Sequence, residues 1–245
     1  MKKGIITKTI GGFFFVADSN VNIYKSKIRG RIQKDVYPGD KVGFENKMIE
    51  EVYERETLLH RPTIANVEQV VLVFSLTHPS FDRKLLDRFL ILIEAYNLDP
   101  IIVLNKIDLD DNKEKVPDLS DYKKAGYKSY YISAKKGLNI EKLYSDLKDK
   151  INVLTGPSGV GKSTLINKMI KSANMRTKKV SKKLKKGVHT TRHVELIPLK
   201  NGGWLADTPG FTSLNINKID SKKLKYLFPE FDDYINKCKF NSCSH

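Results

Sequence analysis

The chain has 245 residues, of which 40% are apolar, and its 44 Lys and Arg against 28 Asp and Glu give a net charge of +16. That apolar content is enough to bury a core, and it argues against global disorder. The longest apolar runs, such as 70–74, are far shorter than the ~20 residues of a transmembrane helix. The N-terminal apolar stretch is too short and too interrupted for a signal peptide, and two Cys exclude a disulfide scaffold, so we expect a cytoplasmic protein that does not span a membrane.

The charge is the first indication of function. A field of this sign attracts polyanions, of which RNA, DNA and anionic membranes are the candidates. The alternative is a basic surface that serves solubility alone. The positions of the cations along the chain distinguish the two.

Residues 1–62 are predicted to form a small β-barrel of the OB type that binds RNA. Short β-branched and aromatic stretches alternate there with turn signals, which predicts strands at 5–9, 12–17, 21–32, 41–44 and 48–53. Within the third stretch four cations recur at every second position: Lys25, Lys27, Arg29 and Arg31. One strand would place them on one face, which suits a phosphate backbone. The alternative is a solvated edge strand that its charges protect from aggregation.

From residue 63 onward, buried strands alternate with amphipathic helices. The patterns predict strands at 70–75, 100–104, 129–133 and 151–155, helices at 82–96, 139–150 and 162–172, and a strand pair at 193–197 and 203–206. Such alternation indicates a parallel α/β sheet with helices on both faces.

The strongest motif lies between the strand at 151–155 and the helix that begins at Lys162. It matches the phosphate-binding pattern G-x-x-x-x-G-K-[ST] and comprises Gly156, Pro157, Ser158, Gly159, Val160, Gly161, Lys162, Ser163 and Thr164. Glycines let backbone N–H groups surround phosphates, and the helix N-terminus adds its dipole. Lys162 is expected to reach the β- and γ-phosphates, and the Ser163 hydroxyl to bind Mg²⁺.

A second motif indicates the base. Asn105, Lys106, Ile107 and Asp108 follow the strand at 100–104, and a carboxylate there can accept from guanine N1–H and its 2-amino group. Adenine lacks that donor pair, so a buried carboxylate would be left unpaired. Asn105 would bind guanine N7, and the Lys106 stem would pack on the base. Backbone N–H groups of Ser133, Ala134 and Lys135 could reach guanine O6. Together with the phosphate loop, these residues favour GTP over ATP.

The Mg²⁺ and γ-phosphate side of the site is expected further along the chain. Asp207 follows the strand at 203–206 and can hold Mg²⁺, while the Gly210 N–H can bond the γ-phosphate. Thr190 and Thr191 lie where a GTPase places the threonine that closes over Mg²⁺.

The order of the motifs is unusual. In GTPases similar to Ras, the phosphate loop is the first of these motifs along the chain. Here the base motif comes first and the phosphate loop follows it. The chain therefore looks circularly permuted.

Catalysis needs a group that orients the attacking water. Ras-like GTPases use Gln after the Asp-x-x-Gly motif, but this chain has Phe211, which cannot bond water. His189 is the nearest polar candidate for this group. Lys162 and Thr191 are the other residues for which we expect a catalytic role. The alternative is a loop histidine that contacts RNA or solvent.

Two further features concern RNA and zinc. Residues 171–186 hold eight Lys and Arg and no acid, which favours RNA binding over a merely solvated linker. Cys238, Cys243 and His245 lie within eight residues, a spacing that suggests one structural zinc ion. A closed site needs four ligands, and the fourth is absent from this chain.

These motifs together resemble the ribosome small-subunit-dependent GTPase A family (RsgA, also called YjeQ). The resemblance covers essentially the whole chain and includes Gly-x-His-Thr-Thr-Arg at 187–192, Asp-Thr-Pro-Gly-Phe at 207–211 and Cys-x₄-Cys-x-His at 238–245. It implies an OB domain at 1–62, a permuted GTPase domain at 63–215 and the start of a zinc-binding region at 216–245. By position, Cys238, Cys243 and His245 match the family's zinc ligands.

The resemblance also implies a function. It implies a GTPase that binds the small (30S) ribosomal subunit and its 16S rRNA late in maturation, is stimulated by it, and leaves after hydrolysis to GDP; we expect it to act as a monomer. The alternatives are a permuted GTPase in another RNA or membrane process, and a GTP-gated RNA-binding module whose hydrolysis is incidental.

Overall fold

The computed structural model describes residues 1–60, 62–109, 116–173, 194–207, 219–235, 237 and 239. The chain divides into two compact units. The first comprises Met1–Gln69, Glu141–Leu154 and Ser163–Phe211, and the second comprises Val70–Ile140, Thr155–Lys162 and Thr212–His245. No helix among the described residues is long and apolar enough to cross a membrane.

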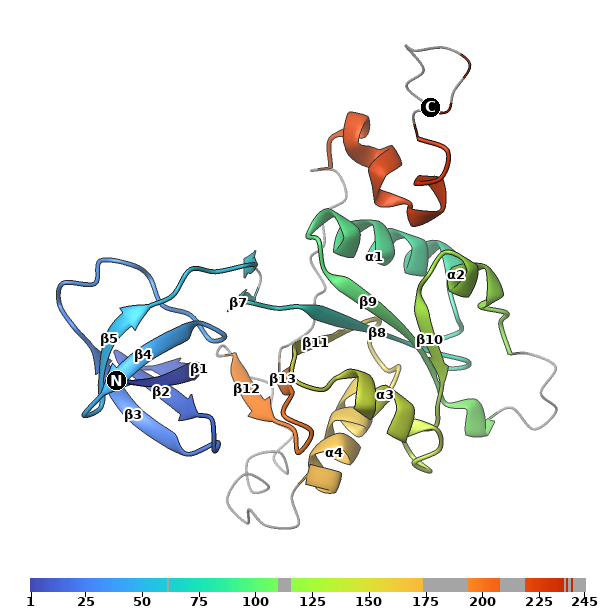
Figure 1. Ribbon diagram of the computed structural model, residues 1–245. Helices are drawn as coiled ribbons and strands as arrows, with labels where there is room; N and C mark the ends of the chain where they lie inside the picture. Colours follow the sequence, from blue (N-terminus) through green and yellow to red (C-terminus); the bar gives the residue numbers. More distant parts are fainter. Residues whose placement is uncertain are drawn as a thin grey trace. The chain divides into compact units, whose positions relative to one another are not determined.

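The N-terminal strands close into a five-stranded barrel, which confirms the predicted architecture (Figure 1). Its strands pair in the order β1-β2-β3-β5-β4. They are β1 (Lys2–Ile10), β2 (Phe13–Asp18), β3 (Ile23–Ile28), β4 (Lys41–Glu45) and β5 (Met48–Val52). The side chains that alternate inward fill the barrel with apolar groups at most 2% exposed: Ile6, Val16, Val42, Phe44 and Ile49.

The third strand is shorter than the sequence predicted. β3 ends at Ile28, and the chain then turns, with the Ile32 N–H donating to the Arg29 carbonyl at 3.0 Å. Only Lys25 and Lys27 therefore lie on β3. Arg29 and Arg31 lie beyond it, and both approach the Glu50 carboxylate, at 2.7 and 3.6 Å. The expected row of four cations on one strand is wrong, because β3 ends at Ile28 and the chain turns between Arg29 and Ile32.

The second sheet has six strands in the order β10-β9-β8-β11-β13-β12. They are β8 (Gln69–Ser75), β9 (Asp99–Asn105), β10 (Lys128–Tyr131), β11 (Ile151–Thr155), β12 (Glu195–Pro198) and β13 (Trp204–Asp207). β10 is parallel to β9 and β11 is parallel to β13, whereas β12 is antiparallel to β13. Every residue of β8 and β11 is buried, the polar Gln69, Ser75, Asn152 and Thr155 included, as expected for inner strands of a covered sheet.

The helices agree with the sequence predictions except in length. α1 (Arg83–Ala95) begins at its cap Asp82, whose carboxylate accepts from the Leu85 N–H at 3.1 Å. α4 (Lys162–Ala173) follows the phosphate loop. α3 (Ile140–Asp146) stops before the predicted residue 150: the N–H groups of Leu147 and Lys148 donate to carbonyls three residues earlier, and Asp149 has a φ of 55°.

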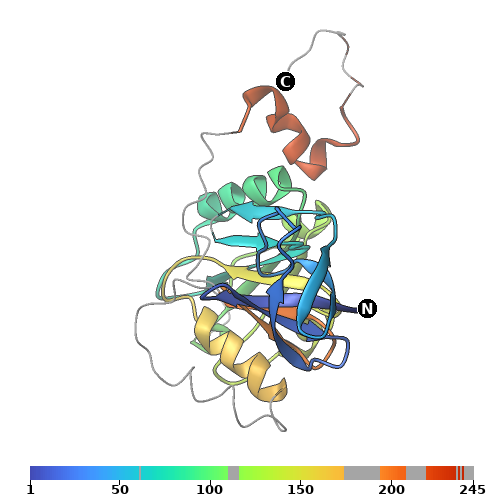
Figure 2. The same cartoon turned by 90° about the vertical axis from the view of Figure 1, so that its left-hand side faces the viewer.

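Several short elements were not predicted. They are the hairpin β6 (Leu58–His60) and β7 (Thr63–Ala65), the helix α2 (Ser120–Lys124) and the 3₁₀ turns η1 (Ile107–Leu109), η3 (Ser221–Leu227) and η4 (Pro229–Phe231). η3 lies beside α1, as Figures 1 and 2 show.

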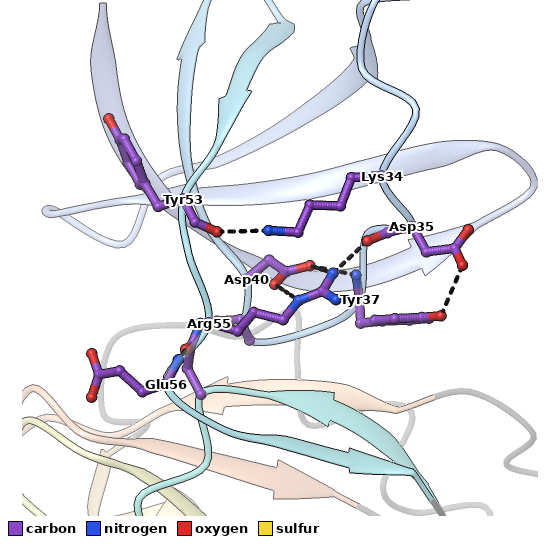
Figure 3. A network of polar contacts seen from close by, with 9 residues as sticks. Lys34, Asp35, Tyr37, Asp40, Tyr53, Arg55 and Glu56 are labelled. Atoms are coloured by element: carbon purple, nitrogen blue, oxygen red, sulfur yellow. Dashed lines mark hydrogen bonds and ion pairs between the residues drawn. The ribbon is translucent and has the colours of Figure 1, made fainter.

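A buried ion pair fastens the loop before β4 to the segment after β5 (Figure 3). The Arg55 guanidinium donates to both oxygens of Asp40, at 2.6 and 2.9 Å, and Asp40 is fully buried. Asp40 also accepts from the Tyr37 N–H at 2.7 Å, and the Tyr37 ring lies under the guanidinium. Hydrogen bonding to Asp40 raises the pKa of Arg55.

Candidate active site

The phosphate loop is the turn that joins β11 to α4. Gly156, Gly159 and Gly161 have φ angles of 136°, 80° and 97°, which L side chains rarely adopt. A Cβ at Gly156 would overlap the Val73 carbonyl oxygen on β8. Glycine at 156 therefore allows the loop to lie directly against the neighbouring strand.

Lys162, at the start of α4, turns back over this loop. Its ammonium group donates to the carbonyls of Gly156 and Pro157, at 2.7 and 2.6 Å. Burial lowers the pKa of Lys162 below its usual value. The cation is thus held over the loop where the motif places a phosphate group.

Asn105, the last residue of β9, connects three motifs. Its side chain is 2% exposed. Its Nδ2 donates to the Val160 carbonyl of the phosphate loop at 2.8 Å, and its Oδ1 accepts from the Ala134 N–H at 2.9 Å. A Cβ at Gly161 would overlap this amide. One side chain therefore brings the base motif, residues 133–135 and the phosphate loop together.

The neighbouring base-motif residues leave β9 in a sharp turn. Lys106 has a φ of 64°, and its ammonium group donates to the carbonyls of Thr77 (3.4 Å) and His78. Ile107 and Asp108 form part of η1, and the Asp108 side chain is half-buried. The Ile107 N–H donates to the Ile132 carbonyl at 3.2 Å, which fixes η1 beside the 133–135 turn.

The 133–135 turn has its own internal bonds. The Ser133 side chain is fully buried and its Oγ accepts from the Lys136 N–H at 3.0 Å, while Lys135 is exposed. The Ala134 N–H is already donated to Asn105. The carbonyls of Thr77 and His78 are partners that sequence reasoning missed, because a His-Pro turn after a strand does not indicate what its backbone contacts.

On the magnesium side of the site, the structure describes the start of α4 and the end of β13. Ser163 and Thr164 are exposed in the first turn of α4, and β13 ends at Asp207, which is paired in register with Glu195. The other predicted residues lie outside the described ones: His189, Thr190, Thr191, Gly210, Phe211, Cys238, Cys243 and His245. In the described ranges there is no group of three or more His, Cys, Asp or Glu residues that could hold a metal ion.

Comparisons with known families match nearly the whole chain. The RsgA N-terminal domain family matches residues 3–53, and the RsgA GTPase family matches residues 52–217. Two relatives named small ribosomal subunit biogenesis GTPase RsgA are similar to it. The protein of Clostridium kluyveri is 42% identical over 250 residues, and that of Clostridium perfringens is 44% identical over 252 residues. Each alignment covers 99% of this chain and 86% of the relative.

Two solved structures have the same architecture over the whole chain. YloQ, described as a circularly permuted GTPase, superposes with a TM-score of 0.81 at 34% identity, and 84% of its chain is covered. YjeQ from Thermotoga maritima gives a TM-score of 0.80 at 34% identity, with 86% of its chain covered. The protein is therefore an enzyme that hydrolyses GTP to GDP with Mg²⁺, and it belongs to the RsgA family of circularly permuted GTPases.

Proposed function

We propose that this GTPase acts late in maturation of the small (30S) ribosomal subunit, where it binds 16S rRNA, hydrolyses GTP to GDP and phosphate, and then leaves. The observation that carries the proposal is the pair of hydrogen bonds by which the Asn105 side chain joins the three nucleotide motifs. Relatives that match nearly the whole chain are named small ribosomal subunit biogenesis GTPases. The net charge of +16 supports an RNA partner.

The proposed division of labour follows the chain. Residues 1–62 bind rRNA, residues 63–215 bind and hydrolyse GTP, and residues 216–245 supply a further contact with the subunit. On the barrel, Lys25 and Lys27 are exposed beside the Phe13 ring, with ammonium groups 3.8 and 5.7 Å from its centre. Cations beside an aromatic ring suit a nucleic-acid strand. The protein would act as a monomer in the cytoplasm, where subunits mature.

The roles of the nucleotide residues follow from their positions. Lys162 neutralises charge on the β- and γ-phosphates, and the N–H groups of the loop Gly156–Gly161, except at Pro157, surround them. Asp108 accepts from the guanine edge, the Lys106 stem packs on the base, and the remaining Asn105 N–H reaches N7. The 133–135 turn lies beside guanine O6. The Asn105 bonds support this arrangement because they hold the base and phosphate motifs together.

The donors on the magnesium side fit a hard cation. The exposed Ser163 hydroxyl and the carboxylate of Asp207 are oxygen ligands of the kind Mg²⁺ prefers, and Thr191 would supply a third. The ion would neutralise charge that develops on the phosphate oxygens. Thr190 and the Gly210 N–H would contact the γ-phosphate directly.

His189 is proposed to orient the attacking water, since Phe211 offers no hydrogen bond. His189→Ala should lower subunit-stimulated phosphate release at least ~10-fold, the scale of a lost general-base or orienting group. GDP affinity should stay within ~2-fold of the wild type, because the role proposed for the imidazole is in hydrolysis and not in binding GDP. A stimulated rate unchanged by the substitution would remove His189 from the mechanism.

We also propose that Cys238, Cys243 and His245 hold one structural zinc ion together with a donor from elsewhere. Two thiolates and an imidazole are the ligands that structural zinc selects. Metal analysis of the purified protein should give close to one zinc per chain, and Cys238→Ser with Cys243→Ser should remove it. Equal zinc in the wild type and the double variant would contradict the assignment.

Phosphate release with purified ribosomal subunits tests the proposed function. Small subunits should raise the rate ~10-fold or more, large subunits should not, and added salt should reduce the stimulation because phosphate contacts release counterions. Equal effects of both subunits would contradict a role on the small subunit. GTP-dependent RNA binding without stimulation would favour the alternative of a GTP-gated RNA-binding module.

A further inference from the structure

Residues 76–80, in the link between β8 and α1, belong to none of the nucleotide motifs, yet they are hydrogen-bonded to one of them and lie near another. The Leu76 N–H donates to the Asn105 carbonyl at 3.0 Å. The carbonyls of Thr77 and His78 accept from the Lys106 ammonium group. Three hydrogen bonds thus join this segment to the first two residues of the base motif.

The same segment also lies near the phosphate loop. A Cβ built on Gly159 would lie 3.7 Å from Pro79 Cδ and 4.0 Å from the His78 carbonyl oxygen, which is ordinary van der Waals contact. The segment therefore lies within reach of both Lys106 and the phosphate loop.

One buried side chain holds the segment in place. The Ser75 hydroxyl donates to the Pro79 carbonyl at 2.7 Å, across the turn that contains Thr77 and His78. Ser75 is the last residue of β8 and only 1% exposed. On the far side of the turn, Asp82 caps α1. The turn is thus fastened at both ends, and its two central carbonyls point to Lys106.

Holding Lys106 has an energetic consequence. A free lysine side chain samples many rotamers, and ordering it costs up to about 2 kcal/mol. A lysine that is already ordered by two carbonyls avoids that cost when a base packs on its stem. Without the hydrogen bond from Ser75 to the Pro79 carbonyl, the cost of ordering Lys106 would again reduce the affinity for the nucleotide.

We infer that Ser75 is a positioning residue for guanine binding: its hydroxyl fixes the 76–80 turn, and the turn's carbonyls hold Lys106 ready to pack against the base. This inference rests on the proposed role of Lys106 in the base pocket. Ser75 itself does not contact the nucleotide.

The test is a double-mutant cycle with Ser75→Ala and Lys106→Met, read as the GDP dissociation constant by calorimetry on the full chain. Ser75→Ala should weaken GDP binding ~5-fold, the scale of one hydrogen bond. Lys106→Met keeps an apolar stem but loses the ammonium group. In that background Ser75→Ala should change the constant by less than ~2-fold, because the group it positions is gone.

Two further variants separate positioning from general destabilisation. Ser129→Ala removes another buried serine hydroxyl, one with no hydrogen-bond partner in the described part of the chain, and should leave GDP binding unchanged. Ser75→Thr keeps the hydroxyl and should restore affinity even if Ser75→Ala folds poorly.

Either of two results would overturn the inference: a Ser75→Ala effect that is fully additive with Lys106→Met, or no effect on GDP binding at all. Neither result bears on the proposed function, which stands or falls on wild-type stimulation by small subunits.

Discussion

Gly156 shows how one residue fixes the position of the phosphate loop. Its φ of 136° and the Val73 carbonyl next to it leave no room for a side chain. The spacing of the motif predicted a glycine-dependent loop at this point. It could not predict the contact with Val73, because that contact depends on which strand lies beside β11.

Gly156→Ala should therefore abolish GDP binding, since the loop must move away from β8. Gly126→Ala is the matched control: Gly126 has a φ of 95° but no atom within 4 Å of a new Cβ. It should cost only about 1–2 kcal/mol of stability and leave GDP binding intact. Calorimetry and urea unfolding of both variants check this. Equal losses of binding would mean that backbone strain alone, and not the Val73 contact, explains the effect.

The base pocket shows what sequence reasoning at the residue scale can reach. The types and spacing of Asn105 and Asp108 predicted a guanine site, because a carboxylate and an amide match the guanine edge. The sequence did not show that Asn105 donates to Val160 and accepts from Ala134, nor that Thr77 and His78 hold Lys106. Backbone carbonyls exist at every residue, so no pattern in the sequence marks the ones that are used.

At the scale of elements, the buried pair Asp40–Arg55 decides how the barrel connects to the segment that follows it (Figure 3). Gly39 and Asp40 also bond across to other segments: the Ile6 N–H donates to the Asp40 carbonyl at 2.9 Å, and the Asn66 side chain donates to the Gly39 carbonyl at 3.0 Å. The turn before β4 is thereby fixed to β1 and to the residues after β7.

Arg55→Met should destabilise the protein by about 3–5 kcal/mol, because it leaves the buried Asp40 carboxylate without its cation. Lys41→Met is the control. The Lys41–Glu56 pair is also short, at 3.0 Å, but its side chains are 51% and 69% exposed. Its loss should cost no more than about 1 kcal/mol. Free energies of unfolding in urea compare the two, and similar values would contradict the importance assigned to burial.

Element boundaries were the weakest sequence predictions, for identifiable reasons. The long strand at 21–32 kept its alternating pattern beyond Ile28, but β3 has paired residues on β5 only at Lys27 and Ile28. The barrel, by contrast, was predictable because turn signals separate its apolar segments regularly. Pattern reports the environment of a side chain, but it does not show where the backbone leaves the sheet: β5 continues to Val52, whereas the chain turns after Ile28, with the Ile32 N–H bonded to the Arg29 carbonyl.

At the scale of the whole molecule, charge is the property most directly tied to the proposed ribosomal partner. Lys25 and Lys27 are exposed on β3, whereas Arg29 and Arg31 are close to Glu50. Cations that face solvent without a carboxylate partner are the ones that release counterions on binding RNA.

Replacing both Lys25 and Lys27 with Gln should lower the slope of log affinity for small subunits against log salt by about one to two units. Replacing Lys123 and Lys124 on α2 with Gln removes the same charge from another surface and should change the slope less. Binding measured across a salt series gives both slopes. If the slope fell by the same amount in both double variants, only the total charge of the protein would matter, and the barrel would have no special role.

The central claim is a guanine-nucleotide pocket built from Asp108 and Lys162, which lie in reversed motif order along a permuted chain. Calorimetric titration of the purified protein with GDP and with ADP, in the presence of Mg²⁺, tests it most directly. The account predicts saturable binding of GDP and binding of ADP weaker by at least ~100-fold, because adenine leaves the Asp108 carboxylate unpaired. Equal affinity for both nucleotides, or binding of neither, would contradict it.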